Sequence, residues 1–212
     1  MGWRQEQQRQ AWANWINAEK WDVFGTLNFA YLHHIGPADK DDVCGKMWRS
    51  FFGAIDRALY GQQRKHQSRF DRVVLVQYGS NGNYPHVHFL AKSPLPAQQF
   101  CILLNAAWAS MYSASARPAS NEITPIIQQA RTTGYVLHEM NRLGGKTYDY
   151  RLSNSNSPAL RPSVRDDAAE RLKQLTTTTN RLKATIEFPN HLQAAQARID
   201  RRDRLAVAAM LR

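Results

Sequence analysis

The chain has 212 residues, of which 43% are hydrophobic and six are tryptophan, as expected for one folded domain with extensions and not for a disordered chain. Its formal net charge of +11 favours a polyanionic partner, with nucleic acid as the first candidate. No stretch of the sequence approaches the roughly 18 to 20 consecutive apolar residues that a membrane span needs, so we expect no membrane partner.

Cysteine usage and the first residues indicate the cellular compartment. The first ten residues are polar and lack the apolar core of a secretory signal peptide. Cys44 and Cys101 are far apart in the sequence, match no CxxC metal pattern and are typical of reduced, buried side chains. We therefore expect a soluble protein of the bacterial or host cell cytoplasm.

Hydrophobic periodicity and turn residues predict an alternation of helices and strands. The Asn-Gly pair at 81–82 is typical of a hairpin turn and joins two of the strands, and Pro125 places a later strand at the edge of its sheet. The predicted elements are a helix over 5–20, a strand over 21–29, a helix over 38–60, strands over 70–78 and 84–90, a helix over 97–112, a strand over 122–128, a helix over 129–143 and a short strand over 147–152.

Six of these elements, between residues 21 and 128, follow the order β-α-β-β-α-β. That order is ferredoxin-like (RRM-like) and predicts an α+β fold in which one antiparallel sheet carries helices on one face, with the strand over 84–90 at or beside its centre. We divide the chain into an N-terminal helix over 1–20, a domain over 21–152 and a linker with a basic helical extension over 153–212. In this extension we predict a charged helix over 163–175 and a final helix from about residue 189.

Two histidines flank one valine in the strand predicted over 84–90. Because side chains alternate between the two faces of a strand, His86 and His88 point to the same side, and Val87 points to the other. Neutral imidazole is a common ligand for divalent metals, so the pair forms half of a metal site. Taken alone, the pair is equally compatible with a solvated strand face.

Two further motifs accompany the histidine pair. Residues 24–28 (FGTLN) lie on the strand predicted over 21–29, and Tyr135 lies on the helix predicted over 129–143. An FxTLT/N strand, an HxH strand and a helix with a tyrosine, in this order, resemble the motifs of HUH endonucleases of the rolling-circle replication-initiator type with a single catalytic tyrosine. The resemblance covers about residues 20 to 145, and the basic charge agrees with it.

The resemblance implies a divalent metal, Mn²⁺ or Mg²⁺, bound by His86 and His88, with Tyr135 as the nucleophile. Many initiators take a third ligand from a Glu on the strand before HxH, where this chain has Gln77, a poorer ligand for a hard cation. Glu139 lies four residues after Tyr135 and so on the same face of the predicted helix. We take Glu139 as the first choice for the third ligand and Gln77 as the second.

Several other residues are expected to contact DNA. His138 stands where the family has the lysine of its YxxK motif, and Arg131 precedes Tyr135 by about one helical turn. The arginines of the C-terminal helix either contact the DNA backbone or form a solvated basic face or a self-association surface. Tyr148 and Tyr150 are the alternative nucleophiles. The residues expected to contact DNA are Thr26, Asn28, Arg131, His138, Arg198, Arg201 and Arg202.

The resemblance implies a metal-dependent DNA endonuclease and strand transferase. Such an enzyme nicks and joins single-stranded DNA at a specific sequence through a 5′-phosphotyrosine, and it initiates rolling-circle replication of a phage, plasmid or related mobile element, for instance at an origin hairpin. The chain has no GxxxxGK[ST] motif, so unwinding is expected from a host helicase. Two alternatives stay open: a single-tyrosine transposase of the same superfamily, and a non-catalytic basic DNA-binding module of the same fold.

Overall fold

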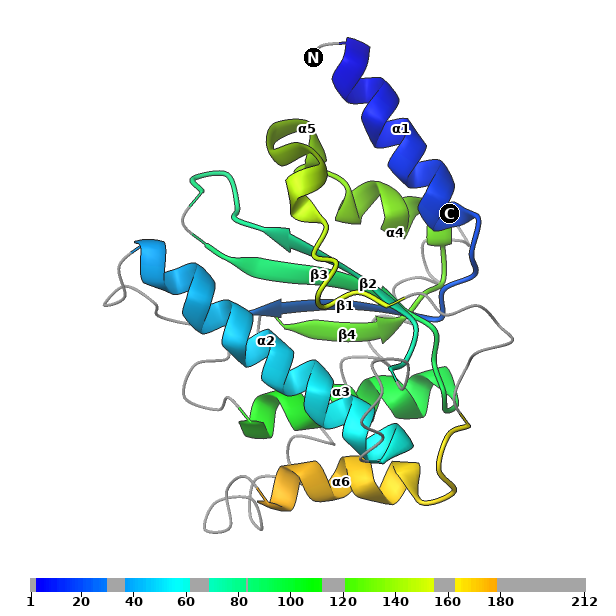
Figure 1. Ribbon diagram of the computed structural model, residues 1–212. Coiled ribbons are helices and arrows are strands. Elements are labelled where there is room, and N and C mark those ends of the chain that lie inside the picture. Colours follow the sequence, from blue (N-terminus) through cyan, green and yellow to red (C-terminus); the bar gives the residue numbers. More distant parts are fainter. Residues whose placement is uncertain are drawn as a thin grey trace, which may run out of the picture.

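Four strands form one antiparallel sheet at the centre of the molecule (Figure 1). The computed structural model describes residues 3–29, 37–61, 69–82, 84–111, 121–154 and 163–178. Over these residues the chain is α+β, as predicted. No helix in these ranges is both long enough and apolar enough to cross a membrane.

The sheet has the strand order β2-β3-β1-β4, and each neighbouring pair is antiparallel. The histidine strand β3 is therefore an inner strand, as predicted, and β4 is an edge strand, as its proline indicated. The hairpin between β2 and β3 is also confirmed. The strands span β1 Val23–Asn28, β2 Arg72–Gln77, β3 His86–Ala91 and β4 Glu122–Pro125.

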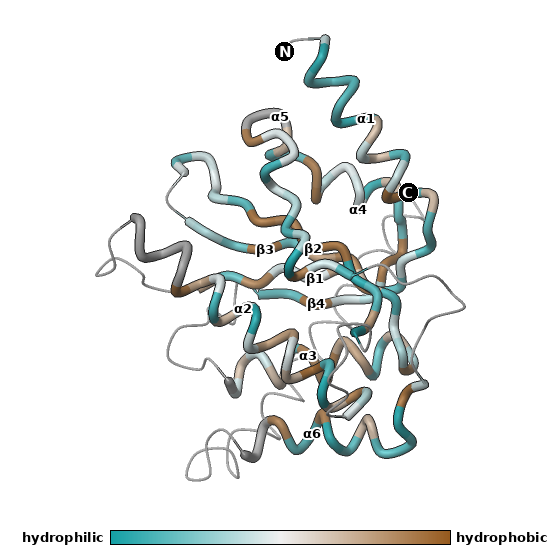
Figure 2. Tube along the Cα trace, in the orientation of Figure 1, coloured by the Kyte–Doolittle hydropathy of each residue, from teal (hydrophilic) through white to brown (hydrophobic). Residues whose placement is uncertain are grey.

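The larger core lies between the sheet and two long helices, α2 (Pro37–Tyr60) and α3 (Ala97–Met111). Val87 and Phe89 enter this core from β3. A third helix, α6 (Ala168–Thr178), packs on the far side of α2 and α3 from the sheet (Figure 1). Figure 2 shows the hydropathy that accompanies this packing. The residues of α3 and of the middle of the sheet are largely hydrophobic, whereas those at the outer end of the N-terminal helix are hydrophilic.

Helices also cover the second face of the sheet, which corrects the expectation that helices lie on one face only (Figure 1). The reason is that β2 and β3 carry apolar side chains on both faces; Leu75 and Leu90 form a second, smaller core with Ile16 and Val136, and a buried apolar face must be covered. The elements on this side are α1 Trp3–Asn17, α4 Gln129–Val136, α5 Met140–Leu143 and the 3₁₀ helix η1 Gly144–Thr147.

The predicted helix over 129–143 is interrupted after Val136, and this prediction was wrong in detail. The backbone N–H of His138 donates to the carbonyl oxygen of Tyr135 at 3.2 Å, and the ring Nδ1 of His138 lies 2.6 Å from the same oxygen. This three-residue contact tightens the turn and ends the regular i to i+4 ladder. Glu139 therefore lies in a turn after α4 and does not share a continuous helix with Tyr135.

The short strand predicted over 147–152 is also wrong. The segment over 148–154 makes only isolated bridges to β2, Tyr148 with Leu75 and Asn154 with Arg72. The helix predicted over 163–175 begins later, at Ala168, and the helix predicted from about residue 189 lies outside the described residues.

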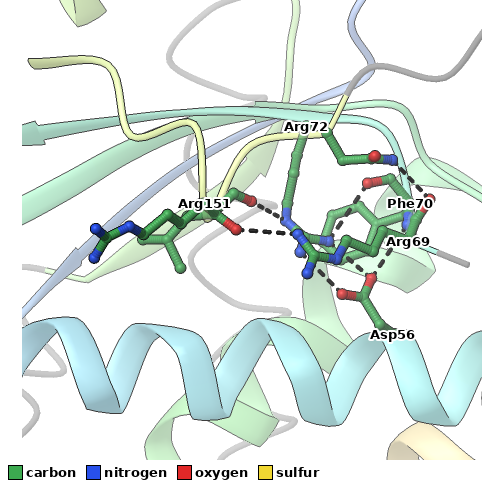
Figure 3. Close-up of polar contacts among 7 residues, drawn as sticks. Asp56, Arg69, Phe70, Arg72 and Arg151 are labelled. Carbon is green, nitrogen blue, oxygen red and sulfur yellow. Dashed lines mark hydrogen bonds and ion pairs between the residues drawn. The ribbon is translucent and has the colours of Figure 1, made fainter. Parts of the chain in front are cut away.

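A buried ion pair joins α2 and β2 to the segment over 148–154 (Figure 3). The guanidinium of Arg72 donates to both carboxylate oxygens of Asp56, at 2.8 and 2.9 Å, and to the carbonyl oxygen of Leu152 at 2.7 Å. Its positive charge also lies over the rings of Phe52 and Phe70, 4.7 and 4.4 Å from their centroids. The charge is buried but fully compensated, so the pair can hold three segments together on the face opposite the second core.

Candidate functional site

The histidine strand presents its two histidines to the face of the sheet that α4 covers. His86, His88 and Leu90 alternate with Val87 and Phe89 along β3, and Leu90 belongs to the smaller core while Val87 and Phe89 belong to the larger one. The shared face predicted for the histidines is confirmed. His88 is only 1% exposed, which rules out a solvated strand face at this position.

Tyr135 lies against the histidine pair, although α4 is far from β3 in the sequence. The ring centroids of His86 and His88 are 5.0 Å apart, and that of Tyr135 is 5.1 Å from His88. His138 completes the cluster, because its ring stacks on Tyr135 at 5.3 Å and lies 5.9 Å from His88. Tyr135 is 53% exposed, so its ring contacts the buried imidazole of His88 and is also accessible to solvent.

A backbone carbonyl determines the proton position on His86. Its Nδ1 lies 2.8 Å from the carbonyl oxygen of Tyr84, and a carbonyl oxygen can only accept a hydrogen bond. In the neutral ring, Nδ1 must therefore carry the proton, which leaves the lone pair on Nε2. This is the tautomer in which Nε2 of His86 can bind a cation.

The amide of Gln77 is oriented in a comparable way. Gln77 lies on β2 directly opposite His86 and is fully buried. Its Nε2 donates to the carbonyl oxygen of Val136 at 2.6 Å, whereas its Oε1 is buried without a partner among the described residues. Because the Val136 oxygen only accepts, the amide cannot be flipped, and its oxygen is the free atom.

Two buried polar atoms at this site have no partner among the described residues, the Oε1 of Gln77 and the Nε2 of His88. A buried polar atom without a partner costs about 1–3 kcal/mol, so such atoms in one place need an explanation. Acceptor atoms from imidazole and amide groups suit a divalent cation of the Mn²⁺ or Mg²⁺ type. The donor set at this site therefore fits the metal that the resemblance implies.

Glu139 lies at the same site from the turn after α4. Its carboxylate accepts a hydrogen bond from the backbone N–H of Tyr78 at 3.0 Å and lies 3.7 Å from Nε2 of His138. Within the described ranges, no three His, Cys, Asp or Glu side chains are grouped closely enough to hold a metal ion by themselves. The third ligand thus stays a prediction, with Glu139 and the Gln77 amide both present.

Burial favours the neutral form of both histidines of the pair. It is the main reason that the pKa of His88 lies well below its ordinary value, and the neighbouring rings of His86 and His138 lower that pKa further. Burial also lowers the pKa of His86, with His138 adding to the effect, while the Tyr84 carbonyl and the Glu139 carboxylate oppose it. Neutral imidazole is the form that binds a metal.

The first motif contributes residues to this site from β1. Thr26 is directly opposite His88, and its Oγ1 lies 2.9 Å from Nδ1 of His88. Asn28 is opposite His86, and its backbone N–H donates to the Asn121 side chain. Sequence reasoning assigned no role to Phe24, yet its ring lies 5.8 Å from the rings of both His88 and Tyr135. The sequence did contain a signal for this position, because Phe24, Thr26 and Asn28 alternate along one strand and therefore share one face of it.

The remaining residues that the sequence suggested are one arginine on α4, two further tyrosines and the C-terminal arginines. Arg131 is exposed on α4. The ring of Tyr148 packs on Trp12 and Trp15, and Tyr150 is 70% exposed beside Arg151. Tyr135 is therefore the tyrosine of these three whose ring contacts the histidine pair. The arginines at 198, 201 and 202 lie outside the described residues.

Comparisons with protein-family models, with curated proteins and with solved structures found no match. The function of this chain is therefore inferred from its motifs and from the geometry of the cluster formed by His86, His88, Tyr135 and His138.

Proposed function

We propose that this chain is an HUH endonuclease that cuts and rejoins single-stranded DNA through Tyr135. The observation that carries the proposal is the contact between the ring of Tyr135 and the buried His88, at 5.1 Å between centroids. The strand order β2-β3-β1-β4 with antiparallel neighbours supports it too, because split βαβ units of the ferredoxin-like type have this order.

The site suits a divalent metal, Mn²⁺ or Mg²⁺, with His86 and His88 as two of its ligands. The unpartnered Nε2 of His88 and Oε1 of Gln77 support this assignment, and Gln77 or Glu139 would supply the third ligand. When bound, such an ion polarises the scissile phosphate and stabilises the charge on the leaving 3′ oxygen.

The phenol of Tyr135 is the nucleophile in this proposal. Its oxygen forms a bond to phosphorus, the bond from phosphorus to the 3′ oxygen breaks, and a 5′-phosphotyrosine and a free 3′-OH result. The ring is half exposed, so DNA can reach it and the phenol proton can leave to solvent. Attack of a 3′-OH on the phosphotyrosine reverses the step and joins strands without ATP.

The basic charge of the chain, +11, supports a DNA substrate. We propose that the nick starts rolling-circle replication of a phage, plasmid or related mobile element and that a host helicase unwinds the duplex. Thr26, Asn28, Arg131 and His138 are proposed DNA contacts, and the three C-terminal arginines remain part of the same prediction.

A covalent-adduct assay tests this proposal. Full-length protein is incubated with Mn²⁺ and a pool of randomised single-stranded oligonucleotides that carry a fluorophore at the 3′ end, and the products are separated on a denaturing protein gel. We expect a fluorescent protein band from the wild type and from Tyr148→Phe, and none from Tyr135→Phe. A band that persists in Tyr135→Phe contradicts the assignment of the nucleophile. Wild-type protein that binds DNA and Mn²⁺ but forms no adduct contradicts the enzyme and favours a non-catalytic DNA-binding module.

A further inference from the structure

The two histidines of the pair are held by different kinds of partner. The Nδ1 of His86 faces a backbone carbonyl, which no substitution removes, whereas the Nδ1 of His88 faces the hydroxyl of Thr26 at 2.9 Å. Thr26 and His88 are direct cross-strand neighbours on the two central strands β1 and β3. The position of the proton on His88 therefore depends on one side chain.

A hydroxyl can donate or accept, so the contact alone allows two tautomers of neutral His88. If Thr26 donated, the proton of His88 would lie on Nε2, a buried atom with no partner among the described residues. A bound cation cannot relieve the cost of a buried N–H without an acceptor, whereas it can relieve that of a buried lone pair. If His88 donates from Nδ1, the proton of the Thr26 hydroxyl can reach solvent, because Thr26 is only half-buried. Nε2 then carries a lone pair.

The ring of His88 cannot easily avoid this choice by rotating. It stacks on Phe24, with 25° between the ring planes, and the rings of His86, Tyr135 and His138 also lie beside it. Packing on these sides determines the plane of the ring, and the hydroxyl determines which edge of it carries the proton. Packing and hydrogen bonding thus have separate effects, which separate substitutions can test.

We propose that Thr26 is a positioning residue that holds His88 in the Nδ1–H tautomer, with the Nε2 lone pair directed into the site for a divalent cation. Partners that fix the tautomer of a ligating histidine commonly change metal affinity by about 10- to 100-fold when they are removed. The inference rests on the proposed function for the identity of the ligand, but the tautomer is a property of the metal-free protein.

Two substitutions isolate the hydroxyl. Thr26→Val keeps the branched shape that suits a strand and removes the hydroxyl, whereas Thr26→Ser keeps the hydroxyl and removes the methyl group. In ¹⁵N-labelled, metal-free, full-length protein at neutral pH, two-bond ¹H–¹⁵N spectra report the protonated nitrogen of each neutral histidine, and His88→Gln assigns the signals of His88. We expect Nδ1–H for His88 in the wild type and in Thr26→Ser, and a mixture with Nε2–H in Thr26→Val. His86 should stay Nδ1–H in all three and serves as the internal control.

Titration with Mn²⁺ alone, followed by the electron paramagnetic resonance signal of the free ion, gives the second readout. We expect Thr26→Val to bind Mn²⁺ about 10- to 100-fold more weakly than the wild type, and Thr26→Ser to recover most of the affinity. An Nε2–H tautomer in the wild type overturns the proposal, as does an unchanged tautomer or Mn²⁺ affinity in Thr26→Val. A wild type that binds no Mn²⁺ overturns it as well. If both expected results are obtained but the adduct assay is negative, the proposed nuclease function fails while the role of Thr26 stands.

Discussion

The side-chain amide of Gln77 donates to the backbone carbonyl of Val136 at 2.6 Å. This bond connects β2, which pairs with the histidine strand, to the last turn of the helix that carries Tyr135. It also fixes which atom of the amide is the oxygen, and that oxygen has no partner among the described residues. One side chain thus helps both to place the proposed nucleophile and to present a candidate metal ligand.

The choice between Gln77 and Glu139 as third ligand can be tested with two nearly isosteric substitutions. The contacts of the two side chains reverse the order expected from the sequence, in which the carboxylate of Glu139 is the first choice. We expect Gln77→Met to weaken Mn²⁺ binding more than Glu139→Gln does, because the Gln77 oxygen has no partner among the described residues while the Glu139 carboxylate already accepts from Tyr78. Mn²⁺ affinity of the full-length variants, measured by calorimetry, decides between them. The reverse ranking would make Glu139 the ligand.

Gln77→Met should also lower the free energy of unfolding. It leaves the buried carbonyl of Val136 without its donor, which costs about 1–3 kcal/mol. Removal of the unpartnered Oε1 offsets part of this cost, so the net loss should lie toward the lower end of that range. Urea unfolding of metal-free protein measures this loss separately from metal binding. Glu139→Gln keeps an oxygen that can accept from Tyr78, so it is the matched control and should lose less stability.

Phe24 should affect the chemical step more than metal binding. Its ring contacts both His88 and Tyr135 at 5.8 Å, and aromatic pairs contribute about 0.5–1.5 kcal/mol beyond their buried area. Phe24→Leu keeps an apolar side chain but loses the ring, so we expect adduct formation in single-turnover experiments to slow by several-fold at saturating Mn²⁺. Mn²⁺ affinity should change by less than that factor. Equal losses in both measurements would mean that Phe24 only supports the histidines.

The hairpin and the shared face of the two histidines could be predicted because turn residues and local alternation determine them. The inner position of β3 could be predicted from the order of the elements. The interruption after Val136 could not be predicted, since it depends on His138 bonding back to Tyr135. Nor did the pattern reveal that both faces of the sheet are covered. The free acceptors of Gln77 and His88 are tertiary properties as well, because their burial arises from α4 packing over β2 and β3.

The ion pair between Asp56 and Arg72 should be a stability feature, separate from the site. Asp56→Asn leaves the guanidinium of Arg72, which is 2% exposed, without its counter-charge, and breaking such a pair costs about 3–5 kcal/mol. Urea unfolding should show a loss of this size. The double variant Asp56→Leu with Arg72→Met should recover part of it, because no buried charge remains. A double variant that is less stable than Asp56→Asn would contradict this explanation.

Gly25 and Gly134 should respond in opposite ways to alanine. A Cβ at Gly25 would overlap the ring of Phe89, its cross-strand neighbour, whereas a Cβ at Gly134 meets no atom within 4 Å apart from its chain neighbours and the backbone of its own helix. Gly25→Ala should therefore destabilise the fold by about 1–3 kcal/mol through overpacking. Gly134→Ala, on α4, should stabilise it by about 0.5–1 kcal/mol because alanine loses less conformational entropy in a helix. Thermal unfolding of the two full-length variants measures both signs. Combining Gly25→Ala with Phe89→Leu, which removes the overlapping ring, should cost less than the sum of the two single changes, and strict additivity would show that the ring is not what excludes a side chain at Gly25.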